Sequence, residues 1–149
     1  MLSRVSSLRI TPPPTSVHSA FADFPGEHAT PLFVCKGIRH LALDGVDPAS
    51  IVGWDRLSIQ LTSLVCTHIS MADVTDLFVG LVLRDAHIES LPAAAWHALQ
   101  YACLAYNELT FIPSSMTTIL PSLRYLDVSH NLLNAVPPAL ELSLIHISE

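Results

Sequence analysis

Apolar residues recur along this chain at fixed positions within a repeating unit. The clearest unit reads L-x-x-L-x-V-x-x-N-x-L-x-x-V-P over residues 123–137. The same order of positions occurs over residues 99–113 as L-x-x-A-x-L-x-x-N-x-L-x-x-I-P, and over residues 78–92 as F-x-x-L-x-L-x-x-A-x-I-x-x-L-P. Two weaker copies begin at Leu61 and Ile38, so that successive copies start 23, 17, 21 and 24 residues apart. A period in this range is that of leucine-rich repeats.

Each unit predicts one short strand followed by a turn and a return segment. Apolar residues at the fourth and sixth positions alternate with other residues, which is the pattern of a strand with one buried face. No single unit can bury its own leucines, so the units must stack, and their strands then form a parallel sheet. The expected strands are 40–44, 63–67, 80–84, 101–105 and 125–129.

The return segments complete the predicted fold. Short helices or helical turns are expected over residues 71–79, 93–99 and 114–120, and a turn is expected at residues 53–55. The fold class is therefore α/β: a leucine-rich-repeat solenoid of about five turns, with a parallel concave β-sheet and short helices or turns on the convex side.

Two asparagines are assigned a structural role. Asn107 and Asn131 occupy the ninth position of their units, where a side-chain amide can bond to backbone groups that the turn would otherwise bury unpaired. In the copy at residues 78–92 this position is Ala86, so that turn is expected to lack the bond. The residues expected to form the inner core are Leu81, Leu83, Leu104, Leu126 and Val128.

The repeats divide the chain into three parts. Residues 1–36 are interpreted as a lead segment that is partly disordered, residues 37–141 as the repeat domain, and residues 142–149 as a tail that fits no repeat position. The tail resembles translated sequencing-adapter read-through. The first residues also carry Arg4 and Arg9 without an acid, with Leu2, Val5 and Leu8 at helical spacing, which leaves a mitochondrial presequence as an alternative.

Charge and composition narrow the classes of function. The formal net charge is −6 and the chain has no basic run, which excludes the basic surface that binds the phosphates of nucleic acid. The charge-poor stretches are interrupted by prolines and polar residues, so no transmembrane segment is expected. Three cysteines without a CxxC pair argue against a disulfide framework and favour a reducing compartment.

The sequence offers little catalytic or metal-binding chemistry. The eight histidines do not form pairs at ligand spacing, so neither a metal site nor a cofactor is expected. Asp127, Ser129 and His130 are too close in sequence to assemble a triad. Cys66 is expected to point into the core and Cys103 to face the concave surface without an assigned base. We therefore expect a protein that is not an enzyme.

The candidate binding residues are those predicted to face outward from the concave sheet. Tyrosine and arginine are enriched at protein interfaces, and both occur there. A solvated face that binds nothing is the alternative. The candidates are His68, Arg84, Asp85, Tyr101, Tyr106, Tyr125, Asp127 and His130.

Two stretches of the repeat region resemble a known family. They are GIRHLALDGVDPASIVGWDRLSIQLTSLVC over residues 37–66 and WHALQYACLAYNELTFIPSSMTTILPSLRYLDVSHNLL over residues 96–133. Both are similar to the N-terminal leucine-rich region of the serine/threonine-kinase-interacting scaffold proteins. Most of the second stretch matches leucine-rich repeats in general, whereas the first covers the irregular early copies.

The resemblance implies an intracellular, cytoplasmic signalling scaffold that binds a protein partner, with a serine/threonine kinase as the candidate partner. It also implies a longer parent protein, of which this chain would be a fragment. A structural brace or cap for that missing region, without a partner of its own, is the alternative function. Because the last predicted strand, at residues 125–129, lacks a polar cap, we expect the isolated chain to self-associate.

Overall fold

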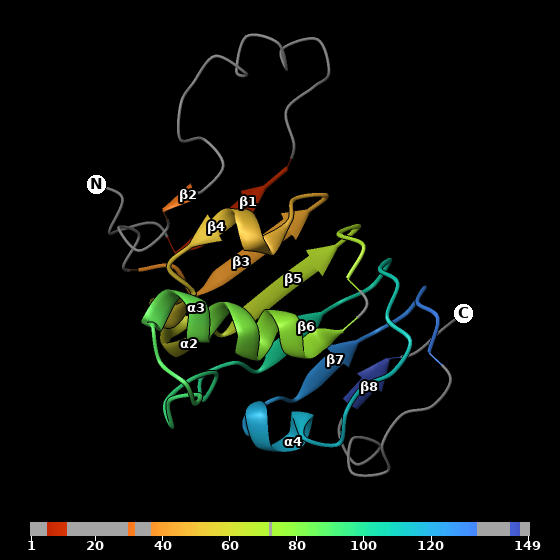
Figure 1. Cartoon of the computed structure of the whole chain (residues 1–149). Helices are drawn as coiled ribbons and strands as arrows, with labels where there is room; N and C mark the ends of the chain where they lie inside the picture. The colour runs from red at the N-terminus through yellow and green to blue at the C-terminus, as the bar shows by residue number, and fades with distance from the viewer. Residues whose placement is uncertain (1–5, 12–29, 32–36, 72, 134–143, 147–149) are drawn as a thin grey trace, which may run out of the picture.

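A six-stranded parallel sheet organises the chain in the computed structural model, which describes residues 6–11, 30–31, 37–71, 73–133 and 144–146 (Figure 1). Neighbouring strands follow one another in chain order, as expected when each strand is joined to the next by a return segment. The strands are β1 (Ser7–Ile10), β3 (His40–Asp44), β5 (Ser63–Thr67), β6 (Tyr101–Cys103), β7 (Tyr125–Asp127) and β8 (Leu144–His146).

The register of the sheet aligns the same position of successive units. Leu41 pairs with Leu64, Leu64 with Ala102, and Ala102 with Leu126, and all four residues are buried. The predicted strands at residues 40–44 and 63–67 are confirmed with their bounds. The strands predicted at residues 101–105 and 125–129 begin as predicted but end at Cys103 and Asp127.

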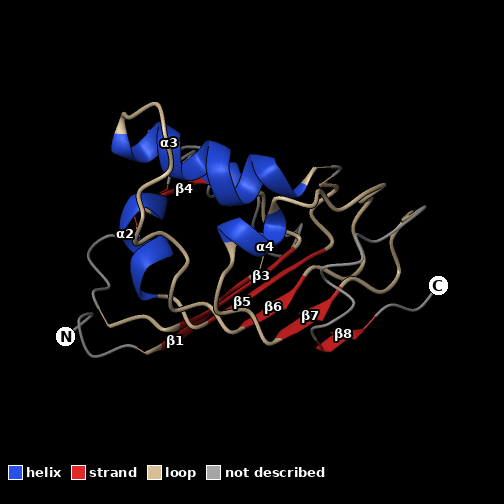
Figure 2. Cartoon of the chain, turned by 90° about the horizontal axis from the view of Figure 1, so that it is seen from below, coloured by secondary structure: helices blue, strands red, loops and turns tan. Residues whose placement is uncertain are grey.

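The helices of the described residues lie together on one face of this sheet, and the opposite face is open (Figure 2). They are the 3-10 helix η2 (Pro48–Ser50), α2 (Trp54–Gln60), the π-helix η3 (Asp76–Gly80), α3 (Leu81–Ala86) and α4 (Met116–Ile119). A small parallel pair, β2 (Thr30–Pro31) with β4 (Ile51–Val52), precedes α2. The turn expected at residues 53–55 is instead the start of α2. Within the described part of the chain, no helix has the length and apolar character needed to cross a membrane.

The strand predicted at residues 80–84 is wrong, because this segment is helical. Val74, Leu77, Phe78 and Val82 are buried at helical spacing, so one apolar stripe runs along η3 and α3. The L-x-x-L-x-L pattern fits that helix as well as it fits a strand. As a consequence β5 pairs directly with β6.

This correction also changes three smaller predictions. Leu81 and Leu83 lie in α3 and are half-buried, so they are not part of the inner core of the sheet. Ala86 ends α3 and does not occupy the asparagine position of a repeat turn. In contrast, Leu104 and Leu126 are buried against the sheet as predicted.

Two tryptophans join the helices to the core. Trp54 and Trp96 are fully buried, with ring centroids 6.3 Å apart, and Phe78 meets Trp96 edge-on at 5.0 Å. Their indole N–H groups donate to backbone carbonyls, at 2.9 Å from Trp54 to Pro48 and at 2.7 Å from Trp96 to Phe78. Because a buried indole N–H needs a partner, each bond fixes where its ring lies.

Asn107 and Asn131 hold successive turns together. The Oδ1 atom of Asn107 accepts from the Ile69 amide at 2.9 Å, and its Nδ2 donates to the carbonyls of Cys66 and Leu104 at 2.8 and 2.9 Å. Asn131 bonds in the same way one turn later: its Oδ1 accepts from the amides of Asn107 and Leu109, both at 3.1 Å. This is the bonding expected of an asparagine at the ninth position.

Both ends of the sheet lie outside the predicted repeat domain. Leu8 and Ile10 of β1 pack against the core from within the predicted lead segment, and β1 pairs with β3. The helical spacing noted for residues 2–8 is therefore not realised at residues 7–10, which form a strand. At the other end β8 pairs with β7, so residues 125–129 are not an uncovered edge. The outer strand there is β8, which lies in the predicted tail. Residues 1–5, 12–29 and 32–36 of the lead segment and residues 142–143 and 147–149 of the tail lie outside the described residues.

Candidate functional site

The open face of the sheet is formed by the side chains that alternate with the buried leucines. Ala42, Val65, Cys103 and Asp127 form one row across β3 to β7, because they are partners in the strand register. The first three are small, so they make a low floor. Larger side chains border this floor on both sides.

One border is a stack of three rings at the turns that follow the strands. The His68 and Tyr106 rings have centroids 4.9 Å apart, and those of Tyr106 and His130 are 4.2 Å apart. The rings are nearly parallel, with interplanar angles of 15° and 7°. All three residues are exposed. We call these three residues the turn stack.

The turn stack is held at one end by a carboxylate. Asp44 Oδ1 lies 2.8 Å from His68 Nδ1 and accepts from the Thr67 hydroxyl at 2.9 Å, while Oδ2 lies 3.7 Å from the Arg9 guanidinium. The hydrogen bond from His68 and that from Thr67 lower the pKa of Asp44 below its ordinary value. The carboxylate therefore stays charged and orients the His68 ring.

The other border of the floor is a pair of tyrosines at the start of the strands. The rings of Tyr101 and Tyr125 stack with centroids 4.9 Å apart and an angle of 3°. Burial raises the pKa of Tyr101, and Cys103, Tyr125 and Asp127 act in the same direction. Asp127 itself is held by the amide and hydroxyl of Ser129, at 3.0 and 2.7 Å. The hydroxyls and ring edges of the pair thus form a fixed, amphipathic surface.

Six of the eight candidate residues therefore lie on or beside the open face, and two do not. Arg84 and Asp85 lie in α3, on the helical side of the sheet. Arg84 donates to the carbonyls of Ala49 and Ile51 at 2.7 and 2.6 Å, and its Nε lies 2.7 Å from Asp85. The prediction that they face the concave sheet is wrong, because it depended on a strand that is a helix.

Asp85 instead completes the start of α2. Its Oδ2 accepts from the amides of Gly53 and Trp54, both at 2.9 Å, which a helix start otherwise leaves unpaired. Burial alone would raise the pKa of Asp85, but the hydrogen bonds from Arg84, Trp54 and Gly53 outweigh it and lower the pKa. This pair of residues therefore joins α3 to α2.

Neither Arg9 nor Asp44 is among the eight candidate binding residues predicted from the sequence. Arg9 pairs in register with Ala42, so its side chain belongs to the open face. The signal that could have found it is the alternation of Ser7, Leu8, Arg9 and Ile10, which has the period of a strand. Asp44 ends its strand next to Gly45, where a turn was expected.

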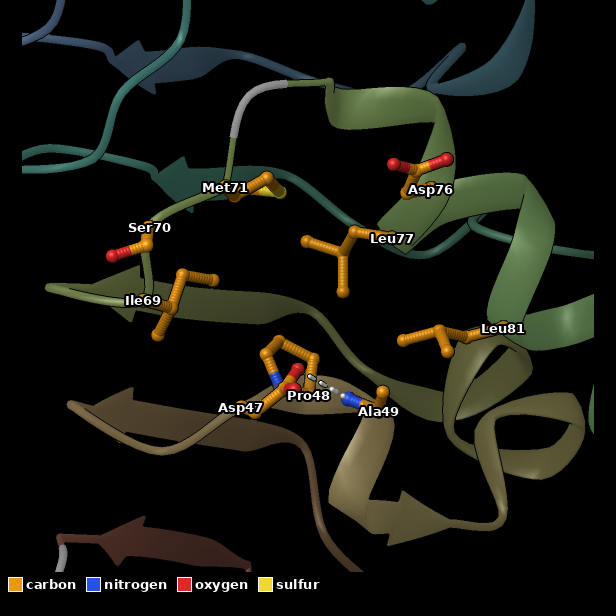
Figure 3. Close-up of a pocket in the computed structure, with 9 residues that line it drawn as sticks. All are labelled: Asp47, Pro48, Ala49, Ile69, Ser70, Met71, Asp76, Leu77 and Leu81. Atoms are coloured by element: carbon orange, nitrogen blue, oxygen red, sulfur yellow. Dashed lines mark hydrogen bonds between the residues drawn. The ribbon is translucent and has the colours of Figure 1, made fainter.

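A separate hollow lies on the helical side, between the turn after β5 and the helices η3 and α3 (Figure 3). Its volume is about 410 Å³. Leu77, Leu81 and Pro48 point into it from three sides, and the carboxylate of Asp76 lies at its border (Figure 3). The Asp47 carboxylate is engaged by the Ala49 amide at 2.9 Å. This hollow brings together none of the eight candidate residues.

The thiols of the described residues are not activated. Cys66 is fully buried, which raises its pKa far above the ordinary value. Burial also raises the pKa of Cys103. Within the described ranges, no three His, Cys, Asp or Glu side chains are grouped so that they could hold a metal ion. The chemistry of the open face is therefore that of stacking, apolar contact and hydrogen bonding.

Comparison with known proteins relates the chain to leucine-rich-repeat proteins. It is 40% identical over 76 residues, 51% of this chain, to a leucine-rich repeat-containing protein of Schizosaccharomyces pombe. It is 34% identical over 100 residues, 67% of this chain, to the human serine/threonine-protein kinase 11-interacting protein. These stretches span 12% and 8% of the two relatives, so the chain corresponds to a small part of each. No protein-family profile matches the chain. The two relatives confirm the resemblance drawn from the repeats: the chain is homologous to a leucine-rich repeat-containing protein and to a kinase-interacting protein.

Proposed function

We propose that this chain is a protein–protein interaction module of a cytoplasmic, kinase-associated signalling scaffold, and that its open sheet face binds the partner. We further propose that its units form a leucine-rich-repeat solenoid, with the η3–α3 helices inserted between two of its strands. In this proposal the chain is not an enzyme and needs no cofactor.

The observation that carries the proposal is the pair of ring stacks on either side of a low floor. Tyr101 and Tyr125 at one border and the turn stack at the other offer rigid aromatic surface, which costs little conformational entropy to bind. The floor between them is made of small side chains, so a polypeptide segment could approach the sheet closely. A serine/threonine kinase is the proposed class of partner because one relative is named for binding such a kinase.

Binding to purified human serine/threonine-protein kinase 11 tests both the module and the partner. The 149-residue chain is immobilised, and kinase binding is measured by biolayer interferometry. In the variant Tyr101→Ser/Tyr125→Ser, affinity should fall by about tenfold or more, the effect of losing about 1.4 kcal/mol of contact.

The matched control is Ile59→Ser on α2. Ile59 is an exposed apolar residue on the helical side of the sheet, with 51% of its surface accessible. Its replacement therefore removes exposed apolar area from the face opposite the proposed binding surface. This variant should bind like the unsubstituted chain. If the Ile59 variant weakens binding and the tyrosine variant does not, the open face is not the binding surface.

Absence of any binding would refute the kinase as the partner of this chain. The alternative function is then a brace for further repeats. β8 is the outer strand of the described sheet, and its outer edge favours this alternative because such an edge can pair with another strand.

A further inference from the structure

Gly45 occupies the same place in its turn as each residue of the turn stack. The Gly45 amide donates to Thr67 O at 2.9 Å, the His68 amide to Tyr106 O at 3.0 Å, and the Tyr106 amide to Ser129 O at 3.1 Å. These bonds link each turn to the next across the sheet. The φ angles are also alike, at 73° for Gly45 and 56°, 59° and 55° for His68, Tyr106 and His130.

The four turns therefore correspond in strand register and in φ, although the His68 amide donates one residue further along its neighbour than the amides of Gly45 and Tyr106 do. Only three of the four turns carry a ring. The stack runs from His130 through Tyr106 to His68, and then reaches a residue without a side chain. Among the described residues none stacks on the second face of His68. The His68 side chain is 60% exposed although Tyr106 covers one face of its ring and Asp44 holds its Nδ1. Within the part of the chain that the structure describes, one ring position of the stack is thus open above Gly45.

The charges around this position favour an aromatic ring over other planar or apolar groups. The Arg9 guanidinium lies 3.7 Å from Asp44 and is 71% exposed, so it borders the open position. An aromatic face is attracted to a guanidinium, and it stacks on imidazole whether His68 is neutral or protonated. An arginine would be repelled by Arg9 and by protonated His68, and the Asp44 carboxylate is already paired with both residues.

We propose that the position above Gly45 receives an aromatic side chain of a bound polypeptide, which extends the turn stack to a fourth ring. The inference deepens the proposed function, because it names the kind of side chain that the open face selects. The partner segment would then present a tryptophan, tyrosine or phenylalanine beside His68. The low floor next to Gly45, formed by Ala42 and Val65, leaves room for the backbone of that segment.

The test is an NMR titration of the 149-residue chain with three short peptides of the form acetyl-Gly-X-Gly-amide, where X is Trp, Leu or Arg. The probes are the His68 ring protons and the Gly45 amide. The tryptophan peptide should move the His68 ring protons upfield through its ring current. The leucine and arginine peptides should produce shifts at least several-fold smaller.

Two substitutions at Gly45 provide the matched pair. Gly45→His fills the open position from within the chain and should abolish the shifts caused by the tryptophan peptide. Gly45→Ala places a side chain without a ring at the same positive φ, and it should leave those shifts unchanged. His68 and Tyr106 adopt this conformation already, so the turn accepts side chains, and circular dichroism verifies that both variants are folded.

The results separate this inference from the proposed function. Equal shifts with the leucine peptide, no shift with the tryptophan peptide, or unchanged binding in Gly45→His would overturn the inference. Kinase binding that is lost in Tyr101→Ser/Tyr125→Ser would still support the open face as the binding surface. If peptide binding follows the prediction but kinase binding is absent, the inference that the position above Gly45 receives an aromatic side chain is supported, and the kinase is not the partner.

Discussion

The two asparagines of the turns should be coupled through one shared carbonyl. Asn107 Nδ2 and Asn131 Nδ2 both donate to Leu104 O, at 2.9 and 2.8 Å. When either asparagine is replaced by alanine, the other still provides a donor for that oxygen. When both are replaced, the carbonyl loses both side-chain donors. Their combined effect on stability should therefore exceed the sum of the single effects.

The single substitutions set the scale. Asn107→Ala deprives the Ile69 amide and the Cys66 carbonyl of their side-chain partner, and Asn107 is 7% exposed, so water can hardly replace it. At about 1–3 kcal/mol for each of these two buried groups left unpaired, the expected loss is about 2–6 kcal/mol. Asn131 is less buried, so Asn131→Ala should cost about 1–3 kcal/mol. The double variant should lose about 1 kcal/mol or more beyond the sum of the two.

Urea unfolding followed by circular dichroism measures these differences. The control pair is Asn107→Ala with Leu99→Val, whose effects should add, since Leu99 makes no bond to Leu104 O. Additive losses in the asparagine pair would refute the shared-carbonyl reasoning. A single Asn107→Ala variant as stable as the unsubstituted chain would refute the role of the turn asparagines altogether.

Three further predictions concern the core, the acid response and assembly. Leu104→Ala should lower the free energy of unfolding by about 2–5 kcal/mol through lost burial and a cavity, and an unchanged urea midpoint would contradict its burial. Asp85→Asn should destabilise the chain at neutral pH. Because the pKa of Asp85 in the folded chain lies below its ordinary 3.8, the carboxylate stabilises the fold above pH 3.8. This stabilisation is lost as the pH falls through the folded pKa. The melting temperatures of the unsubstituted chain and of Asp85→Asn should therefore converge in acid. A difference that stays constant with pH would contradict the stabilising role of the Asp85 carboxylate. The 149-residue chain should self-associate through the β8 edge at micromolar concentration, and a monomer by size-exclusion chromatography with light scattering would contradict this.

The repeat pattern predicted the parts of the fold in which local sequence and packing agree. Leu41 and Leu64 alternate with polar or small residues in strands of five, and the sheet formed as expected. Asn107 could be assigned from its position alone, since the turn creates a fixed set of backbone groups to satisfy. The pattern failed at residues 78–86, where the spacing of Phe78 and Val82 suits a helix and only tertiary packing decides between the alternatives.

The candidate site was predictable in part for a related reason. The register of a parallel sheet brings equivalent positions together, so Tyr101 and Tyr125 could be expected as neighbours. The ring stack of His68, Tyr106 and His130 depends on turns with positive φ, which no periodicity reveals. Arg9 lies beyond the recognisable repeats, and it reaches the site only because β1 joins the sheet.

The insertion of η3 and α3 shows that the spacing of strands along the chain is independent of their spacing in the sheet. Leu41 and Leu64 are 23 residues apart, Leu64 and Ala102 are 38 apart, and Ala102 and Leu126 are 24 apart, yet each pair is in direct register. The helical side can therefore grow without moving the open face. Evolution or a protein engineer could lengthen, shorten or exchange this return segment and alter one side of the molecule, while the geometry of the open face stays the same.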